Sequence, residues 1–235
     1  MNILGIVLGS FICLGSVGSY IPQFYKIIKS NSVKGISEIS LVIQNVGLMC
    51  LTMNALIFSW DSITTLDYLN LLPFFQILIS WLMVLVYYLI FIIYKFKNYE
   101  KRILSGLKYV FTYLFFAIFV IALALGEKYR PQRNFFQIFA DVLGYSSAVC
   151  NGFVYLPQIY LLYKEKDSGS LSFLTFIIQT PGNVVIIVFQ AVIYNAAVST
   201  WITYLIVFVE QSIILMQMTY YHFRKDRELE NVIVG

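Results

Sequence analysis

The chain alternates long apolar stretches with short polar connections. Seven of these stretches come close to the roughly 20 residues that a helix needs to cross the hydrocarbon core of a bilayer. They run over residues 3–28, 38–60, 69–94, 103–125, 135–163, 171–194 and 200–222. The connections are too short to hold a soluble domain. The pattern therefore predicts one compact, all-α integral membrane protein with seven transmembrane helices.

Composition and charge agree with a membrane protein and add an orientation. Hydrophobic residues make up 60% of the chain and charged residues only 12%, against roughly 25% charged residues in soluble domains. Thirteen of the 16 lysines and arginines fall in alternate connections, in the adjoining ends of the spans or in the C-terminal tail, and the positive-inside rule places these segments in the cytosol. The N-terminus is then expected on the lumenal or extracellular side and the C-terminus in the cytosol. Because these cations are scattered among loops, the net charge of +4 requires no nucleic-acid partner.

An internal repeat is found when the chain is shifted by 135 residues against itself. SYIPQFYK at 19–26 then falls on VYLPQIYL at 154–161, and nine of 28 gapless positions from Tyr20 onward are identical, where about two are expected by chance. The same shift carries Gln76 onto Gln211. The fourth span has no counterpart, and it lets the second unit insert in the same orientation as the first. We predict two parallel three-helix repeats joined by a linker helix (3+1+3), over residues 1–94, 95–134 and 135–235.

These motifs resemble those of the PQ-loop family, which includes cystinosin, lysosomal and vacuolar exporters of cationic amino acids and, more distantly, the SWEET sugar transporters. The likeness covers nearly the whole chain. It consists of two Pro-Gln pairs, each followed by a basic loop that ends in GIS at 35–37 or SLS at 170–172, and of the 3+1+3 order of spans. The resemblance implies a membrane transporter that works without a cofactor. It is a strong indicator of family and a weak one of substrate.

The two Pro-Gln pairs are candidate hinges. Pro22 and Pro157 lack an N–H and crowd a carbonyl four residues earlier, so each weakens one turn near the cytosolic third of its helix. Gln23 and Gln158 are expected to hydrogen-bond the backbone groups that this releases. From the residues alone, a static kink is an equally good interpretation. The resemblance favours a hinge that bends during transport, because the Pro-Gln helices of the family flank the transport path.

Side-chain amides mark four spans at a depth where polar groups should face the bundle interior. Pro181 and Gly182 in the sixth span suggest a broken or bent helix, which is tolerated where it lines a cavity. We therefore predict a solute site between the repeats. For any one residue the alternative is an interhelical hydrogen bond that only holds the bundle together. The six candidates are Gln44, Asn45, Gln76, Gln179, Asn183 and Gln211.

Two acidic residues lie inside predicted spans and have no acidic counterpart in the other repeat. Glu210, near the middle of the seventh span, is expected to bind and release a proton, because an ionised carboxylate is costly there. Asp141 is a second candidate for proton coupling. It lies nearer the lumenal face, where an ion pair with a cation at 128–133 is the structural alternative. In cystinosin-like members an acid associated with coupling aligns with Gln179, which cannot titrate, so that mechanism of cystine transport is not expected.

No motif of an enzyme is found, and His222, the only histidine, has no Cys or His cluster beside it, so no metal is expected. The leading hypothesis is a secondary transporter in a lysosomal, vacuolar or other endomembrane. It would move a small polar solute, by resemblance an amino acid, from the lumen to the cytosol, with protons carried through Glu210. Two alternatives stay open: a facilitative sugar transporter similar to the SWEETs, and a seven-helix sorting receptor or scaffold that resembles the KDEL receptor.

Overall fold

The computed structural model describes residues 3–60, 62, 71–96, 133–193 and 198–234, and part of the stretch from 103 to 122. All regular elements in these residues are helices. In chain order they are α1 (Ile3–Ser30), α2 (Glu38–Phe58), α4 (Leu72–Lys95), α6 (Arg133–Phe153), α7 (Leu156–Glu165), α8 (Phe173–Val188), the π-helical turn η2 (Phe189–Ile193) and α9 (Val198–Val234). The described residues of the fourth predicted span are helical too. The predicted all-α fold in 3+1+3 order is confirmed.

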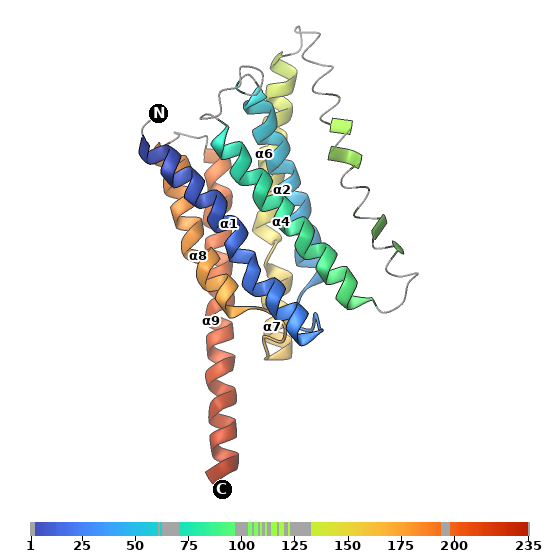
Figure 1. The fold of residues 1–235 in the computed structure, drawn as a ribbon, viewed down its shortest axis with the longest axis vertical. Coiled ribbons are helices and arrows are strands. Elements are labelled where there is room, and N and C mark those ends of the chain that lie inside the picture. The colour runs from blue at the N-terminus through green and yellow to red at the C-terminus, as the bar shows by residue number, and fades with distance from the viewer. Residues whose placement is uncertain are drawn as a thin grey trace.

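Two trios of helices form the bundle (Figure 1). In the first trio α4 packs against both α1 and α2. In the second, α6 and α7 together form one span, and α9 packs against both of them and against α8. The most extensive helix contacts between the trios are those of α2 with α6 and of α1 with α8. A shift of 135 residues exchanges α1 with α6 and α2 with α8. The α2–α6 and α1–α8 interfaces are therefore equivalent in the repeat, and their differences can be compared residue by residue.

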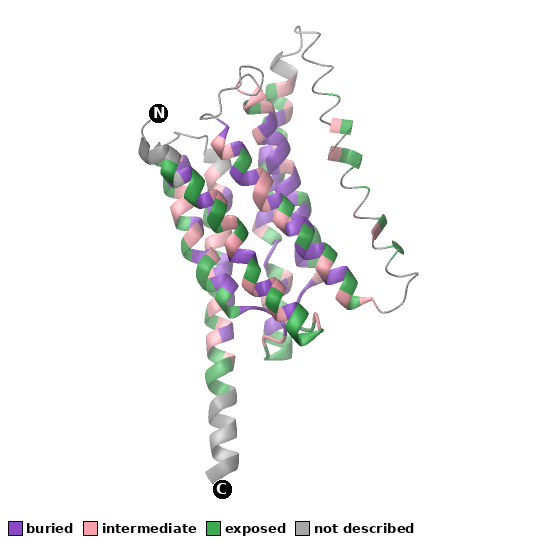
Figure 2. Cartoon of the chain, in the orientation of Figure 1, coloured by how far each residue is buried: buried purple, intermediate pink, exposed green. Residues whose placement is uncertain are grey.

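The outer surface of the bundle is apolar. Figure 2 shows the buried residues gathered between the helices and the exposed residues on their outer faces, and large side chains such as Phe11, Leu14 and Tyr25 lie on that exposed surface. Such extended apolar exposure is typical of a surface covered by lipid. Among the described helices, four segments are long and apolar enough to cross a membrane: Glu38–Phe58, Leu72–Lys95, Phe173–Val192 and Trp201–Arg224.

The first trio is built around α4. Trp81 is almost completely buried, and its indole N–H donates to Oδ1 of Asn45 at 3.2 Å. The linker segment packs on the same helix, with the Phe116 ring centroid 4.7 Å from that of Trp81. The Tyr109 hydroxyl adds a hydrogen bond of 3.1 Å to the Leu85 carbonyl. The linker is thus attached to the first trio by both ring packing and hydrogen bonding.

The two Pro-Gln helices have different backbones. α1 continues through Pro22, whereas the second Pro-Gln helix stops at Phe153 and restarts at Leu156 as α7. Pro157 lies in the first turn of α7, where a missing N–H breaks no helical hydrogen bond, so the helix can restart there. α8 runs unbroken through Pro181. The irregular backbone of this span lies instead about two turns further on, in η2.

Candidate transport pathway

Two loops cross at one end of the bundle, which we term the crossed-loop end. Loop 31–37 joins α1 to α2, and loop 166–172 joins α7 to α8. The N–H of Ser170 donates to the carbonyl of Lys34 at 2.7 Å. A Cβ on Gly169 would overlap the Lys34 carbonyl oxygen, and one on Gly35 would lie 2.8 Å from the Ser168 oxygen. Both glycines have positive φ, +52° and +83°, so the crossing requires glycine for its space and its conformation.

Gln23 of α1 binds the loop of the opposite repeat. Its Oε1 accepts from the N–H of Ser172 at 2.7 Å, and its Nε2 donates to the carbonyl of Ser170 at 3.0 Å. Lys26, one turn further along α1, adds a hydrogen bond from Nζ to the carbonyl of Leu171 at 2.6 Å. The first repeat thus contacts three consecutive residues of loop 166–172.

Gln158 of α7 does the same in the other direction. Its Oε1 accepts from the N–H of Ser37 at 2.8 Å, and its Nε2 donates to the carbonyl of Gly35 at 2.8 Å. We term the contacts of Gln23 and Gln158 the glutamine clamps. The expectation that these amides serve the backbone of their own helices is wrong, because the free donors and acceptors they meet belong to the opposite loop. Both amides are buried, and their four hydrogen bonds join the two repeats at the crossed-loop end.

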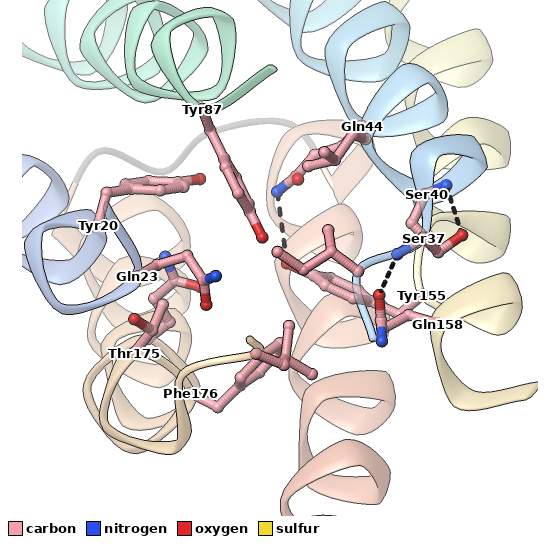
Figure 3. Close-up of a pocket in the computed structure, with 14 residues that line it drawn as sticks. Tyr20, Gln23, Ser37, Ser40, Gln44, Tyr87, Tyr155, Gln158, Thr175 and Phe176 are labelled. Atoms are coloured by element: carbon pink, nitrogen blue, oxygen red, sulfur yellow. Dashed lines mark hydrogen bonds between the residues drawn. The ribbon is translucent and has the colours of Figure 1, made fainter. Parts of the chain in front are cut away.

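On the side of the clamps that faces away from the crossed loops, three tyrosines narrow the space between the repeats. Tyr20 and Tyr87 lie with ring centroids 6.4 Å apart, and Tyr155, from the link between α6 and α7, faces them across a small cavity (Figure 3). This cavity has a volume of only about 30 Å³, far below the roughly 300 Å³ or more of small-molecule sites. Gln44 donates from Nε2 to the Tyr155 hydroxyl at 3.3 Å, as Figure 3 shows. The tyrosines therefore separate the clamps from a much larger cavity.

The larger cavity lies between the repeats, on the far side of the tyrosines from the crossed loops. Its volume is about 390 Å³, within the range of small-molecule sites. Residues from α1, α2, α4, α6, α8 and α9 line it, together with Tyr155. Four of the six predicted solute-binding amides are among the lining residues: Gln44, Gln179, Asn183 and Gln211. We term this space the central cavity.

Gln211 is the centre of a hydrogen-bond network on the wall of the central cavity. Its Nε2 donates to the Tyr155 hydroxyl at 2.9 Å and to Oε1 of Gln179 at 3.3 Å. Its Oε1 accepts from Nδ2 of Asn183 at 2.9 Å and from the Thr180 hydroxyl at 3.5 Å. The network fixes the orientation of amides from α8 and α9, which gives the cavity a defined set of donors and acceptors.

The other two predicted amides lie elsewhere. Asn45 is buried and accepts from Trp81, and Gln76 is completely buried in α4, away from the residues that line the central cavity. No described residue gives the Gln76 side-chain amide a hydrogen bond. Gln76 and Gln211 are counterparts in the repeat, so the same residue type has a different environment in each half.

The sequence did not single out the tyrosines or the small hydroxyls that line the path. In the sequence, Tyr20 and Tyr155 stand out only as identical residues at equivalent positions of the two repeats. Equivalent positions in two facing repeats are the signal that could have placed the two side chains close together. The hydroxyls of Ser16 and Ser80, with Asn151 of α6, also line the central cavity. Serine carries little signal in an apolar run, because it also bonds its own helix, as Ser80 does with the carbonyl of Gln76 at 2.9 Å.

The two predicted coupling acids have contrasting surroundings. Glu210 is buried in α9, next to Gln211, and its carboxylate lies near the backbone N–H of Tyr155. No described residue gives either carboxylate oxygen a hydrogen bond of good geometry. Asp141 is exposed on α6. Two of its predicted ion-pair partners lie outside the described residues, and so does the side chain of the third, Arg133.

Comparison with known proteins agrees with this architecture. The family model of the PQ loop repeat matches residues 4–64 and 139–196, together about half of the chain. The two matches begin 135 residues apart, the same shift that aligns the repeats. The chain therefore belongs to the PQ-loop repeat family.

Structural comparison identifies a related fold. A eukaryotic SWEET transporter, solved at 3.7 Å resolution, matches with a TM-score of 0.57 over 93% of this chain and 99% of that chain, at 12% sequence identity. A search of curated protein sequences finds no match. Family and fold together indicate an integral membrane protein of the transporter type.

Proposed function

We propose that the chain is a secondary transporter that carries an amino acid from an organelle lumen to the cytosol by alternating access. The observation that carries the proposal is the central cavity, which lies between two repeats and is bounded on one side by the tyrosines and the glutamine clamps. Among the described residues, side-chain hydrogen bonds join the repeats at this end, including those of Gln23, Gln158 and Lys26, together with one backbone hydrogen bond at the loop crossing. A rocking motion of the two trios can therefore open this end without unfolding a helix.

The wall of the central cavity suits the polar groups of an amino acid. The amides of Gln44, Gln179 and Asn183 offer donors and acceptors at one place. The interruption between α6 and α7 places the C-terminus of α6 and the N-terminus of α7 on either side of Tyr155, which lines the cavity. The Tyr155 side chain does not cap the N-terminus of α7. Helix N-termini favour carboxylate groups, and broken helices recur at transporter sites for this reason.

The proposed orientation of the protein in the membrane is argued from the charges. The crossed-loop end carries Lys26, Lys29 and Lys34, and Lys95 at the end of α4 forms an ion pair there with Glu38. The positive-inside rule makes this end cytosolic. Proton coupling through Glu210 completes the proposal, because a buried carboxylate beside the network can change charge as the cavity changes access. Lysosomal or vacuolar membrane is the proposed location.

Transport into liposomes tests the proposal. Purified protein, reconstituted with an imposed pH gradient, should take up at least one labelled amino acid and exchange it in counterflow. A facilitative sugar transporter is the second candidate, favoured by the fold shared with the SWEET structure, and it would carry a hexose regardless of the gradient. Specific binding of a ligand without flux of any solute would contradict transport and favour a receptor.

A further inference from the structure

The central cavity owes its position to a difference between the two equivalent interfaces. At the α2–α6 interface the helices are in contact, since a Cβ on Gly47 would lie 3.1 Å from Cβ of Cys150 and 3.3 Å from Nδ2 of Asn151. At the α1–α8 interface, Gly182 is the counterpart of Gly47 and Gly15 is the counterpart of Cys150. A Cβ on either of these glycines would meet nothing within 4 Å. The space left there belongs to the central cavity, which both glycines line.

The walls of the cavity divide into a polar and an apolar part. Nearer the crossed loops lie the amides of the network, with Ser19 of α1. Further from the loops the wall is mainly aliphatic and aromatic, with a few hydroxyls and the amide of Asn151. The apolar residues of this part are Phe11, Ile12, Leu48, Leu51, Val185, Ile186 and Val207.

The apolar part reaches the outer surface of the bundle. Phe11 and Gly15 of α1, and Ile178 and Pro181 of α8, line the cavity and are exposed as well. Figures 1 and 2 show these two helices side by side. A solute bound at the amides therefore has a lipid-like surface beside it, with room for a bulky apolar group between α1 and α8.

Charge gives a second restriction on the solute. No Asp, Glu, Lys or Arg is found among the residues that line the central cavity in the described part of the chain. A charged side chain on the solute would be taken from water without a counter-charge, which is strongly unfavourable. The α-ammonium and α-carboxylate groups differ from such a side chain, because the amides, the Tyr155 hydroxyl and the helix ends can bind both.

We propose that the transported solute is an amino acid with a large, uncharged, apolar side chain, such as leucine or phenylalanine. The polar end lies at the amides, and the side chain lies against Phe11, Ile12 and Val185 in the α1–α8 gap. This inference rests on the proposed function. It excludes cationic and acidic amino acids and cystine as good substrates.

Counterflow of a solute panel in proteoliposomes tests the inference. The panel contains labelled leucine, phenylalanine, alanine, arginine, glutamate, cystine and glucose. Leucine and phenylalanine should exchange with an affinity roughly 10- to 100-fold above that of alanine, as burial of a large apolar side chain predicts. Preference for arginine, glutamate or cystine, or equal rates for alanine and leucine, would overturn the inference while amino acid transport stood. Exchange of glucose alone would overturn both.

A pair of substitutions in α1 locates the side-chain site. Gly15→Leu adds a side chain that points into the gap, and it should weaken leucine and phenylalanine exchange roughly tenfold or more while alanine exchange remains. Gly18→Leu is the matched control, because a Cβ there also meets nothing within 4 Å but Gly18 does not line the cavity. If Gly15→Leu does not elute as a monodisperse protein, Gly15→Ala gives the smaller version of the change. An unchanged ratio of leucine to alanine exchange in a folded Gly15 variant would place the apolar group elsewhere.

Discussion

The α2–α6 and α1–α8 interfaces are equivalent in the repeat but differ in how closely they are packed. Asn54 of α2 donates from Nδ2 to the carbonyl of Ala140 at 2.7 Å, and a Cβ on Gly144 would lie 3.0 Å from this Asn54 nitrogen. The counterparts of Asn54 and Gly144 are Phe189 and Gly9. There a Cβ on Gly9 would lie 3.0 Å from the Phe189 ring, the same separation as at Gly144. At these equivalent positions, the α2–α6 interface has a hydrogen bond and the α1–α8 interface has an apolar contact with the Phe189 ring.

We infer that the α1–α8 interface is the one that moves, because a Cβ on Gly15 or Gly182 would meet nothing within 4 Å. Close glycine contacts at Gly47 and Gly144, with one hydrogen bond, leave the α2–α6 interface little freedom to slide. The α1–α8 interface contains the central cavity and ends in η2, and π-helical turns occur frequently at functional sites. We expect the trios to rock about the α2–α6 interface while the α1–α8 interface opens and closes.

Cross-linking gives the largest expected contrast between the two interfaces. With Cys13 and Cys50 replaced by alanine, Gly47→Cys would place its Cβ 3.1 Å from Cβ of Cys150. This is a little closer than the roughly 3.5–4.5 Å of disulfides, so a small separation of the two helices allows the bond. Oxidation should link the α2–α6 interface and leave counterflow nearly intact. Gly15→Cys with Gly182→Cys, in a chain that also lacks Cys150, should be linked by a short bis-maleimide. That bridge should abolish counterflow.

The controls for this experiment are the same variants before cross-linking and after reduction of the disulfide. If the link between position 47 and Cys150 abolished counterflow, and the link between positions 15 and 182 did not, the moving interface would be α2–α6. Inhibition by both bridges would mean that both interfaces move during transport, and it would contradict a pivot at the α2–α6 interface.

A second contrast uses the counterparts Gln211 and Gln76. Gln211→Leu removes four hydrogen bonds from the wall of the central cavity and should raise the KM of transport roughly tenfold or more. Gln76→Leu removes a buried amide that no described residue hydrogen-bonds, so transport should be nearly unchanged and thermal stability equal or higher. Uptake kinetics and a thermal melt of both variants measure this. Equal losses would mean that the pair acts through the bundle and not through the cavity.

The sequence predicted the architecture more completely than it predicted the side-chain contacts. Apolar run length predicted the spans, and the Tyr20–Tyr155 register predicted the repeat, because both signals are local or periodic. The partners of Gln23 and Gln158 are more than 120 residues away along the chain. No local pattern distinguishes such a partner from a carbonyl of the same helix.

The same limit applies to the two prolines. Pro22 and Pro157 lie in similar sequences, yet only the second Pro-Gln helix is interrupted. Gln76 and Gln211 also look alike in sequence, and only packing separates the buried amide from the one on the cavity wall. Repeat identity therefore predicts that two residues occupy equivalent positions, but not that they have equivalent environments.

The glutamine clamps provide a third test, with a smaller effect. Gln158→Leu removes two hydrogen bonds to loop 31–37, which at about 0.6 kcal/mol each should favour the open crossed-loop end by roughly sevenfold. Gln23→Leu should have a weaker effect, because Lys26 still holds loop 166–172. The labelling rate of Ser40→Cys, a residue of the small cavity, by an impermeant maleimide reports the opening in a chain without other cysteines. Faster labelling in Gln23→Leu than in Gln158→Leu would contradict the role of Lys26.

Glu210 distinguishes the repeats chemically, since its counterpart is Phe75. Glu210→Gln keeps the shape and removes the charge, so stimulation of uptake by an acidic lumen should disappear while counterflow at equal pH continues. Asp141→Asn is the matched control on the exposed face of α6, and it should leave the response to pH unchanged. Uptake measured across a series of pH gradients gives the result. A normal acid response in Glu210→Gln would remove Glu210 from coupling.

The smallest expected effect concerns the hydrogen bond in the α2–α6 interface. Asn54→Ala removes the bond to the Ala140 carbonyl, and interhelical bonds of this kind contribute about 0.6 kcal/mol and at most about 1.7 kcal/mol in membranes. The carbonyl lies within α6, so it can keep its bond along the helix and is not left without a donor. If close packing at the glycines is what holds the pivot, a thermal melt should move only slightly and the rate of counterflow should not change. A clear rise in counterflow would show that the hydrogen bond, and not the glycine packing, restrains this interface.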